Sequence, residues 1–252
     1  PPRSTPKPSS AASDVYKRQH RYWWEVNGCV AAYCNEGAFL LNTITIQTLL
    51  RENPDYAQAV ARYFPDAEYG PIVDCTNYLF HRHTYHLPPC FRPATRDVLQ
   101  ELHAHPQITP VILTNSKGDK VHKNLRIIGM EHTLILGDTR QYDMTPTWCF
   151  PHPRQGPLQF WPVDERYTVD LRRPVYYHAL QREADKGERL VVVADTFSMP
   201  GALPLLMGYP FILLKTSYTP AWCEQVVAAH PRGYVLRDLA ALPQVVIALA
   251  EA

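Results

Sequence analysis

The sequence predicts an α/β fold: a three-layer domain with a parallel central sheet over residues 70–252, preceded by a small helical segment at residues 20–69. Two observations support this prediction. Short apolar runs alternate with stretches whose apolar residues have helical spacing, and several of these runs end in polar side chains. The runs are Ile72–Val73, Val111–Leu113, Thr133–Leu136, Val191–Ala194 and Phe211–Leu214, with a last run from Tyr234. Such alternation is typical of βαβ connections and of parallel strands covered by helices.

The composition fits one globular domain with a small appendage, since 46% of the 252 residues are hydrophobic and 19% are charged. The six cysteines are scattered without a CxxC pair, which favours free thiols in a reducing compartment over a disulfide framework. The longest apolar stretch, residues 202–214, is interrupted by prolines and is shorter than the roughly 20 residues of a membrane span. We therefore expect a cytoplasmic protein without a membrane-spanning helix.

Residues 1–19 are rich in Pro, Ser and Ala and resemble a translated sequencing adapter. We expect them to be a scar or a disordered tail that carries no fold. Without them, the 25 basic and 24 acidic residues of the chain become 21 and 23, and the net charge changes from +1 to −2. This charge balance provides no electrostatic footprint for nucleic acid.

The segment 20–69 is predicted to be helical, either as the remnant of a longer upstream region or as a cap over the site. Apolar spacing predicts one helix at residues 42–51. A second helix, at residues 55–64, follows Asn53-Pro54 and carries Asp55 in its first turn, where the helix dipole favours a negative charge.

Asp74 follows Ile72–Val73, which places a carboxylate at the carboxyl end of a predicted strand. In open α/β sheets this edge is where ligands bind. A carboxylate directly after a buried strand is costly unless it is paired, hydrogen-bonded or bound to a metal. The alternative interpretation is an Asp that caps a helix or forms a turn.

Thr114 and Asn115 follow the predicted strand 111–113, which comes after a helix predicted at residues 93–105. The next helix, at residues 119–128, ends at Gly129, as expected for a C-terminal glycine. The Thr114 hydroxyl is therefore either a helix cap or a donor to phosphate oxygens.

Residues 144–169 are rich in proline and aromatic residues and show little periodicity, so we predict a long loop or insertion. It is either a lid that shapes the substrate site or a surface excursion. A helix then begins near Arg173-Pro174, and the strand 191–194 ends at Asp195.

The order and spacing of Asp74, Thr114 and Asp195 resemble the haloacid dehalogenase (HAD) superfamily, over about residues 70 to 245. This resemblance implies a Rossmann-like fold and phosphoryl transfer through an aspartyl intermediate. Arg173-Pro174 resembles the Lys-Pro of the family, in which the cation holds the nucleophile and the phosphate.

The resemblance further implies a Mg²⁺ site formed by Asp74, Asp195 and the backbone carbonyl of Thr76, since Mg²⁺ prefers oxygen ligands. Thr114 and the backbone of Asn115 would hold the phosphoryl oxygens, and Arg173 would balance their charge. The expected substrate is a small phosphorylated metabolite.

Three positions depart from the family pattern. Thr76 stands where hydrolysing relatives usually carry an Asp that acts as general acid and base. Arg173 replaces lysine, and Pro200 stands where a second Asp is common. Three hypotheses remain: a Mg²⁺-dependent phosphatase or phosphotransferase, a non-catalytic HAD-like binding protein, and a dehalogenase-type hydrolase that needs no metal.

Overall fold

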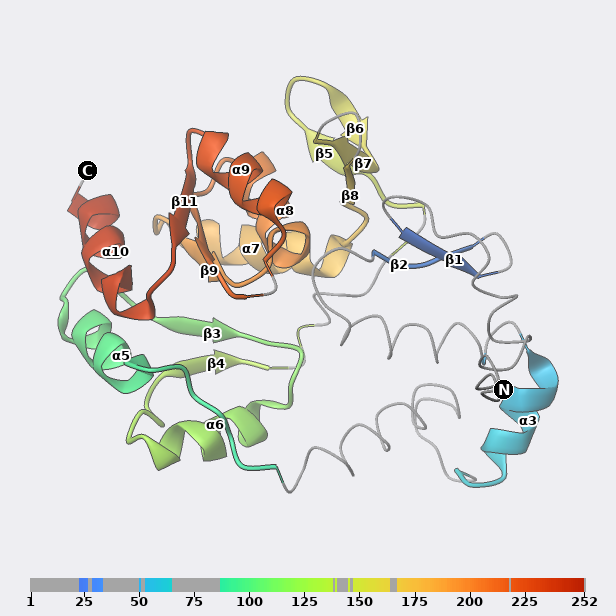
Figure 1. Cartoon of the computed structure of the whole chain (residues 1–252), viewed down its shortest axis with the longest axis horizontal. Helices are drawn as coiled ribbons and strands as arrows, with labels where there is room; N and C mark the ends of the chain where they lie inside the picture. Colours follow the sequence, from blue (N-terminus) through green and yellow to red (C-terminus); the bar gives the residue numbers. More distant parts are fainter. Residues whose placement is uncertain are drawn as a thin grey trace, which may run out of the picture. The chain divides into compact units, whose positions relative to one another are not determined.

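The computed structural model describes residues 23–26, 29–33, 50, 53–64, 87–137, 139, 145, 147–163, 167–217 and 219–251, which form a mixed α/β chain (Figure 1). The chain divides into two compact units. The N-terminal unit comprises residues 1–88 and 164–167, and the C-terminal unit comprises residues 89–163 and 168–252. The predicted tail at 1–19 and the predicted boundary at 69–70 lie outside the described residues. Within the described ranges, every helix is too short or too polar to cross a bilayer.

The N-terminal unit contains a β-hairpin and a helix. Strands β1 (Trp23–Val26) and β2 (Cys29–Tyr33) pair antiparallel, with Val26 opposite Cys29. Helix α3 (Pro54–Ala61) begins with proline in its first turn, where the missing N–H costs no hydrogen bond. The prediction of a purely helical segment is therefore correct for α3 and misses the hairpin. The dipeptide Asn27-Gly28 between the two apolar runs was the available signal for it.

A three-stranded parallel sheet forms the larger sheet of the C-terminal unit. Its strands are β9 (Val192–Ala194), β10 (Phe211–Leu214) and β11 (Gly233–Leu236), in the order β11-β10-β9. In register, Leu213 pairs with Ala194 on one side and with Val235 on the other. The three apolar runs predicted here are confirmed as parallel strands.

A second parallel pair joins β3 (Val111–Leu113) to β4 (Leu134–Leu136). The parallel strands thus lie in two small sheets, where the sequence predicted one central sheet. The remaining predicted strand, Ile72–Val73, lies outside the described residues.

Helices cover both faces of the larger sheet. Successive side chains of a strand point to opposite faces, so neighbouring residues of β10 pack against different helices. On one face, Ile212 packs with residues of α5 (Thr95–Ala104) and α10 (Leu242–Glu251). On the other face, Phe211 and Leu213 pack with residues of α7 (Pro174–Ala184), α8 (Ala202–Leu206) and α9 (Ala221–Ala229).

The smaller sheet has the same arrangement. Ile112 of β3 lines an apolar cavity together with α5 and α6 (Gly118–Ile127), whereas the adjacent Leu113 lines a cleft together with α7. Helices α5 and α7 therefore lie on opposite faces and contribute to the cover of both sheets. Each segment that leads from one parallel strand to the next contains a helix, as parallel connections require.

The segment predicted as a long loop or insertion, residues 144–169, contains short strands among its described residues, so it is not an irregular loop throughout. β5 (Phe150–His152) pairs antiparallel with β6 (Gly156–Leu158), and β7 (Phe160–Pro162) pairs antiparallel with β8 (Thr168–Asp170). Trp148 and Trp161 pack against the core that contains Phe211. Proline, glycine and polar residues interrupt these short strands, so they do not form the apolar runs by which β3, β4 and β9 were predicted.

A kinked segment, η1 (Phe197–Gly201), connects β9 to α8; Met199 within it is extended, and Pro200 follows. Gly201 lies directly under the Phe211 ring, so a Cβ at this position would overlap the ring. The segment therefore packs its backbone onto β10.

Candidate functional site

The loop after β3 carries Thr114 and Asn115 at the carboxyl end of the strand, as predicted. Ser116 N donates to Thr114 Oγ1 at 3.1 Å. A hydroxyl can also donate its own hydrogen, so Thr114 retains the chemistry of a phosphate-oxygen donor.

This loop is joined to the loop after β4 by Thr139. Thr139 Oγ1 donates to Thr114 O at 3.0 Å and to Asn115 Oδ1 at 3.4 Å, and Thr139 N donates to Thr114 O at 3.2 Å. Gly137 also lies against Gly118, because a Cβ at position 137 would be 2.5 Å from Gly118 N and 2.8 Å from its Cα. The two loops are thus in contact through backbone and side chain. Sequence reasoning did not find Thr139.

Asp195 lies at the carboxyl end of β9, also as predicted, and forms an ion pair that was not predicted. Arg92 Nη2 donates to Asp195 Oδ2 at 2.9 Å, across 103 positions of sequence. Both side chains are accessible to water, 55% for Asp195 and 37% for Arg92. No local pattern could have identified Arg92, since only the packing of α5 beside β9 brings it here.

Arg92 itself belongs to the turn that starts α5. Its carbonyl accepts from Thr95 Oγ1 at 2.7 Å and from Thr95 N at 3.2 Å. Ala94 in the same turn has a φ of +61°, in the left-handed region that L-residues rarely adopt. The backbone of Arg92 is therefore fixed by the helix start, while its guanidinium reaches the sheet edge.

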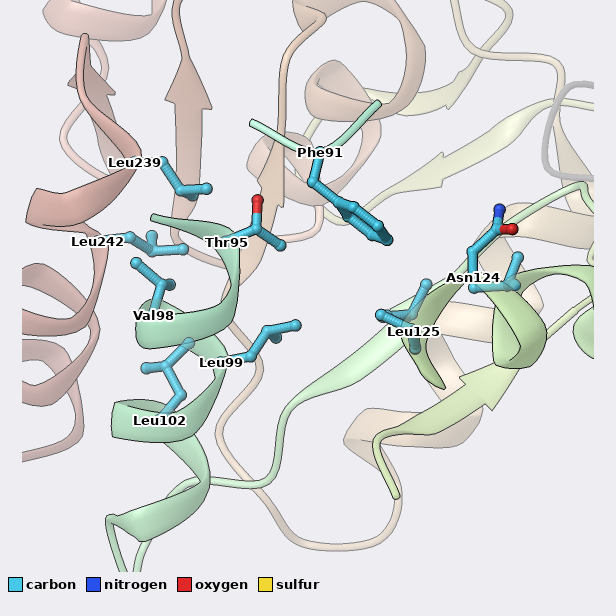
Figure 2. Close-up of a pocket in the computed structure, with 11 residues that line it drawn as sticks. Phe91, Thr95, Val98, Leu99, Leu102, Asn124, Leu125, Leu239 and Leu242 are labelled. Atoms are coloured by element: carbon cyan, nitrogen blue, oxygen red, sulfur yellow. The ribbon is translucent and has the colours of Figure 1, made fainter. Parts of the chain in front are cut away.

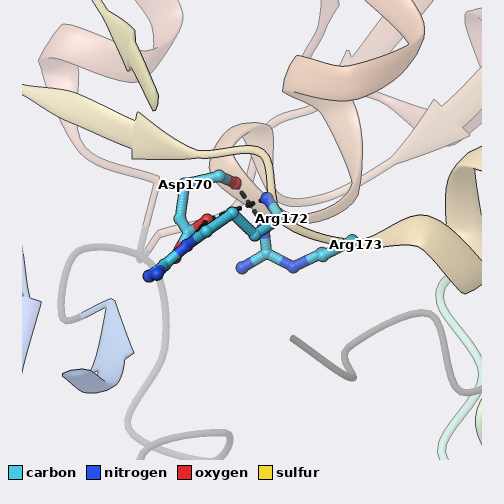
Figure 3. A network of polar contacts seen from close by, with 3 residues as sticks. All are labelled: Asp170, Arg172 and Arg173. Atoms are coloured by element: carbon cyan, nitrogen blue, oxygen red, sulfur yellow. Dashed lines mark hydrogen bonds and ion pairs between the residues drawn. The ribbon is translucent and has the colours of Figure 1, made fainter. Parts of the chain in front are cut away.

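Arg173 is buried at the junction between β8 and α7, where its guanidinium Nη1 donates to the backbone carbonyl of Asp170 (Figure 3). The same junction holds an ion pair that sequence reasoning missed. The Asp170 carboxylate accepts from Arg172 Nη2 at 2.7 Å, from Arg172 Nε at 3.0 Å and from Arg172 N at 2.8 Å. The Arg172 guanidinium also lies 4.8 Å from the centre of the Phe160 ring. Arg173 is thus a buried cation at the first turn of a helix.

The two remaining predicted residues, Asp74 and Thr76, lie outside the described residues. Among the residues that the structure does describe, no three His, Cys, Asp or Glu side chains form a group able to hold a metal ion. Of the predicted metal ligands, Asp195 lies within the described residues and offers a carboxylate of the kind that Mg²⁺ accepts. To bind a cation, it would have to exchange its contact with Arg92.

A second charged group lies at the same edge of the larger sheet. Glu224 of α9 accepts from Lys215, which follows β10, and from Arg237 Nη2 at 3.4 Å, which follows β11. The hydrogen bond from the Lys215 ammonium holds the pKa of the Glu224 carboxyl below its usual value. Asp238, which follows Arg237 in the chain, accepts from Ala240 N at 3.0 Å and caps the following turn.

The described residues of the C-terminal unit form an apolar cavity and a cleft. The first, of about 340 Å³, opens between α5 and α6 and is lined mainly by apolar side chains, with Thr95 and Asn124 as polar members (Figure 2). It carries no charged group and offers no chemistry. The second, a cleft of about 640 Å³, lies between α7 and the β3–β4 pair and includes Gly137 and Thr139.

Comparisons with protein-family models, with curated proteins and with solved structures gave no match to this chain.

Proposed function

We propose that the chain is a HAD-like hydrolase with a three-layer, Rossmann-like core: a Mg²⁺-dependent phosphatase or phosphotransferase that acts on a small phosphorylated metabolite. One observation carries the proposal. Thr114 and Asp195 follow parallel strands, β3 and β9, in sheets that share α5 on one face and α7 on the other. In the proposed fold, the strand predicted to end at Asp74 runs parallel to these strands, and Asp74 shares their carboxyl edge, where ligands of open α/β sheets bind.

In this proposal Asp74 is the nucleophile. Its carboxylate oxygen forms a bond to phosphorus while the bond to the leaving oxygen breaks, and water then hydrolyses the aspartyl phosphate to release inorganic phosphate. Mg²⁺, when bound, neutralises phosphoryl charge so that an anionic nucleophile can approach. Asp74, Asp195 and the carbonyl of Thr76 would hold the ion. Thr114 and the Asn115 backbone would bind the phosphoryl oxygens.

Arg173 fits the role of charge balance because it precedes α7 at the end of the helix opposite to the short connection that leads to the amino end of β9. Since its guanidinium is buried, its charge acts in a medium of low effective dielectric constant, where electrostatic interactions are strong. Thr76 supplies no general acid, so proton transfer to the leaving oxygen would depend on water and turnover would be slow.

Hydrolysis of phenyl phosphate with and without Mg²⁺ tests the proposal. We expect slow, Mg²⁺-dependent release of phosphate that falls at least about 10³-fold in Asp74→Asn, as for the loss of a nucleophile. Asp195→Asn should weaken Mg²⁺ binding measured by calorimetry. Glu188→Gln, which removes an exposed carboxylate elsewhere, is the matched control and should change neither property.

The two other hypotheses give different results in the same experiment. Turnover of a halogenated acid without any metal would favour the dehalogenase-type hydrolase. Absence of both turnover and Mg²⁺ binding in the parent chain would favour the non-catalytic binding protein and contradict the proposal.

A further inference from the structure

The cleft between α7 and the β3–β4 pair has an apolar lining with charges at its rim. Strand residues Leu113, Ile135 and Leu136 and helix residues Val175 and Ala179 line it. Its volume of about 640 Å³ lies within the roughly 300–1,000 Å³ of small-molecule sites. Val175 is 41% exposed, although it is a large apolar side chain. Covering it with an apolar ligand would therefore be favourable.

The cleft adjoins the loop that carries Thr114 and Asn115. Thr139 lines the cleft and also donates to Thr114 O and to Asn115 Oδ1. One wall of the cleft is thus hydrogen-bonded to the loop that is proposed to bind the phosphoryl group. A ligand held by that loop would therefore begin beside the cleft.

The charges at the rim come from the last turn of α7. A short connection leads from α7 to the amino end of β9, so the last turn of the helix points away from the carboxyl edge and the first turn points toward it. Arg182 lies seven residues after Val175, about 10 Å further along the helix at 1.5 Å per residue. Lys186 pairs with Glu183, so the side chains that line the cleft carry one positive charge in excess, that of Arg182.

We propose that this cleft binds the organic part of the substrate, an elongated apolar group that links the phosphoryl group to a carboxylate paired with Arg182. The inference rests on the proposed function, because it takes the phosphoryl group to be bound by the Thr114–Asn115 loop. The ligand class follows from the order of the lining: a polar loop at one end, an apolar path of about 10 Å, and a cation at the other end. Arginine favours a carboxylate because its planar fork can donate two hydrogen bonds to it.

Binding of three phosphonates, measured by calorimetry with Mg²⁺ present, tests this inference without requiring turnover. They are methylphosphonate, octylphosphonate and 8-carboxyoctylphosphonate. We expect octylphosphonate to bind at least about tenfold more tightly than methylphosphonate, because each buried methylene adds affinity. The carboxylate should add a further factor of about three to ten.

Single substitutions at exposed positions of the cleft test whether these gains in affinity come from binding there. Val175→Asp should remove the gain from the octyl chain, and Arg182→Gln should remove only the gain from the carboxylate. Arg154→Gln removes an exposed guanidinium from the β5–β6 turn and is the matched control, with all three affinities unchanged. Circular dichroism of each variant verifies that the fold is retained.

The remaining outcomes of the binding experiment bear differently on the cleft and on the phosphoryl site. Equal affinity for methyl- and octylphosphonate would overturn the inference and leave the proposed function intact. If nonanedioate binds as tightly as 8-carboxyoctylphosphonate, and both lose affinity in Val175→Asp, the cleft stands and the phosphoryl site fails. No binding of any of the three phosphonates would overturn both.

Discussion

The Asp170–Arg172 pair and the Arg92–Asp195 pair join the same two chemical groups at similar distances, 2.7 Å and 2.9 Å. They differ in burial. The side chains of Asp170 and Arg172 are 0% and 11% exposed, whereas those of Asp195 and Arg92 are 55% and 37% exposed. The first pair connects residues two apart at a strand end, and the second connects segments 103 positions apart.

The difference in burial separates a structural pair from an exchangeable one. A buried carboxylate has no water to replace a lost partner, so Asp170 depends on Arg172. An exposed carboxylate can exchange a guanidinium for water or for a cation at little cost. Asp195 is therefore suited to bind a ligand ion, and Asp170 is suited to fix the chain between β8 and Arg173.

The largest effect is expected at the buried pair. Asp170→Ala should lower the free energy of unfolding by about 3–5 kcal/mol, because it leaves the Arg172 guanidinium without its buried partner. Chemical denaturation followed by circular dichroism measures this loss.

The double variant Asp170→Leu/Arg172→Met should be less destabilised than Asp170→Leu alone, since it removes the Arg172 charge together with the carboxylate that compensates it. A loss below about 1 kcal/mol in Asp170→Ala would mean that water reaches the pair, and the contrast between the two sites would disappear.

A smaller effect is expected at the exposed pair. Arg92→Gln should change the free energy of unfolding by less than about 1 kcal/mol. If Asp195 binds Mg²⁺ as proposed, the same variant should bind the ion more tightly, by up to about fivefold, because the competing guanidinium is gone. Calorimetric titration with Mg²⁺ measures this change, with Arg154→Gln as the control. Weaker Mg²⁺ binding in Arg92→Gln would show that Arg92 supports the ion and does not compete with it.

The smallest effect concerns Glu224, which is partly buried and is paired with Lys215. Its pKa is lowered in the folded chain, so the pair stabilises the fold above the ordinary glutamate pKa of 4.5, and this contribution is lost as the pH falls through the lowered value. Glu224→Gln should therefore be less stable than the parent at neutral pH, and the difference should shrink in acid. Thermal melts at pH 7 and at successively lower pH values test this. A difference that is the same at every pH would exclude the ion pair as its cause.

The elements with clear periodicity could be predicted from the sequence. Helices α5, α6 and α7 and strands β3, β4, β9 and β10 lie within two residues of their predicted bounds, because apolar spacing and the residues Pro174 and Gly129 mark them. Strands β5 to β8 could not be predicted, since Pro, Gly and polar residues interrupt them and they form no continuous apolar run as β3, β4 and β9 do. The β1–β2 hairpin was missed although Asn27-Gly28 signals it, because the whole segment was predicted to be helical.

At the site, sequence position predicted which residues follow strands but not what they contact. Thr114 and Asp195 come at the strand ends as expected. Their partners Thr139 and Arg92 come from other loops, and pairing between loops depends on packing that no local pattern records. Burial of Arg173 was also unpredictable, because its neighbours Asp170 and Arg172 look like an ordinary polar turn.

The backbone contact between Gly137 and Gly118 has an evolutionary consequence. The loop after β4 cannot gain a side chain at position 137 without separating from the start of α6, since a single methyl group there would overlap the Gly118 backbone. A methyl group at position 118 would meet only Ile135 Cγ2, at 4.0 Å, so the constraint falls on position 137, although the residue it protects is 19 positions away. In any relative that retains this pair of loops, position 137 should be glycine, and a larger residue there should be accompanied by a lengthened loop after β3 or β4.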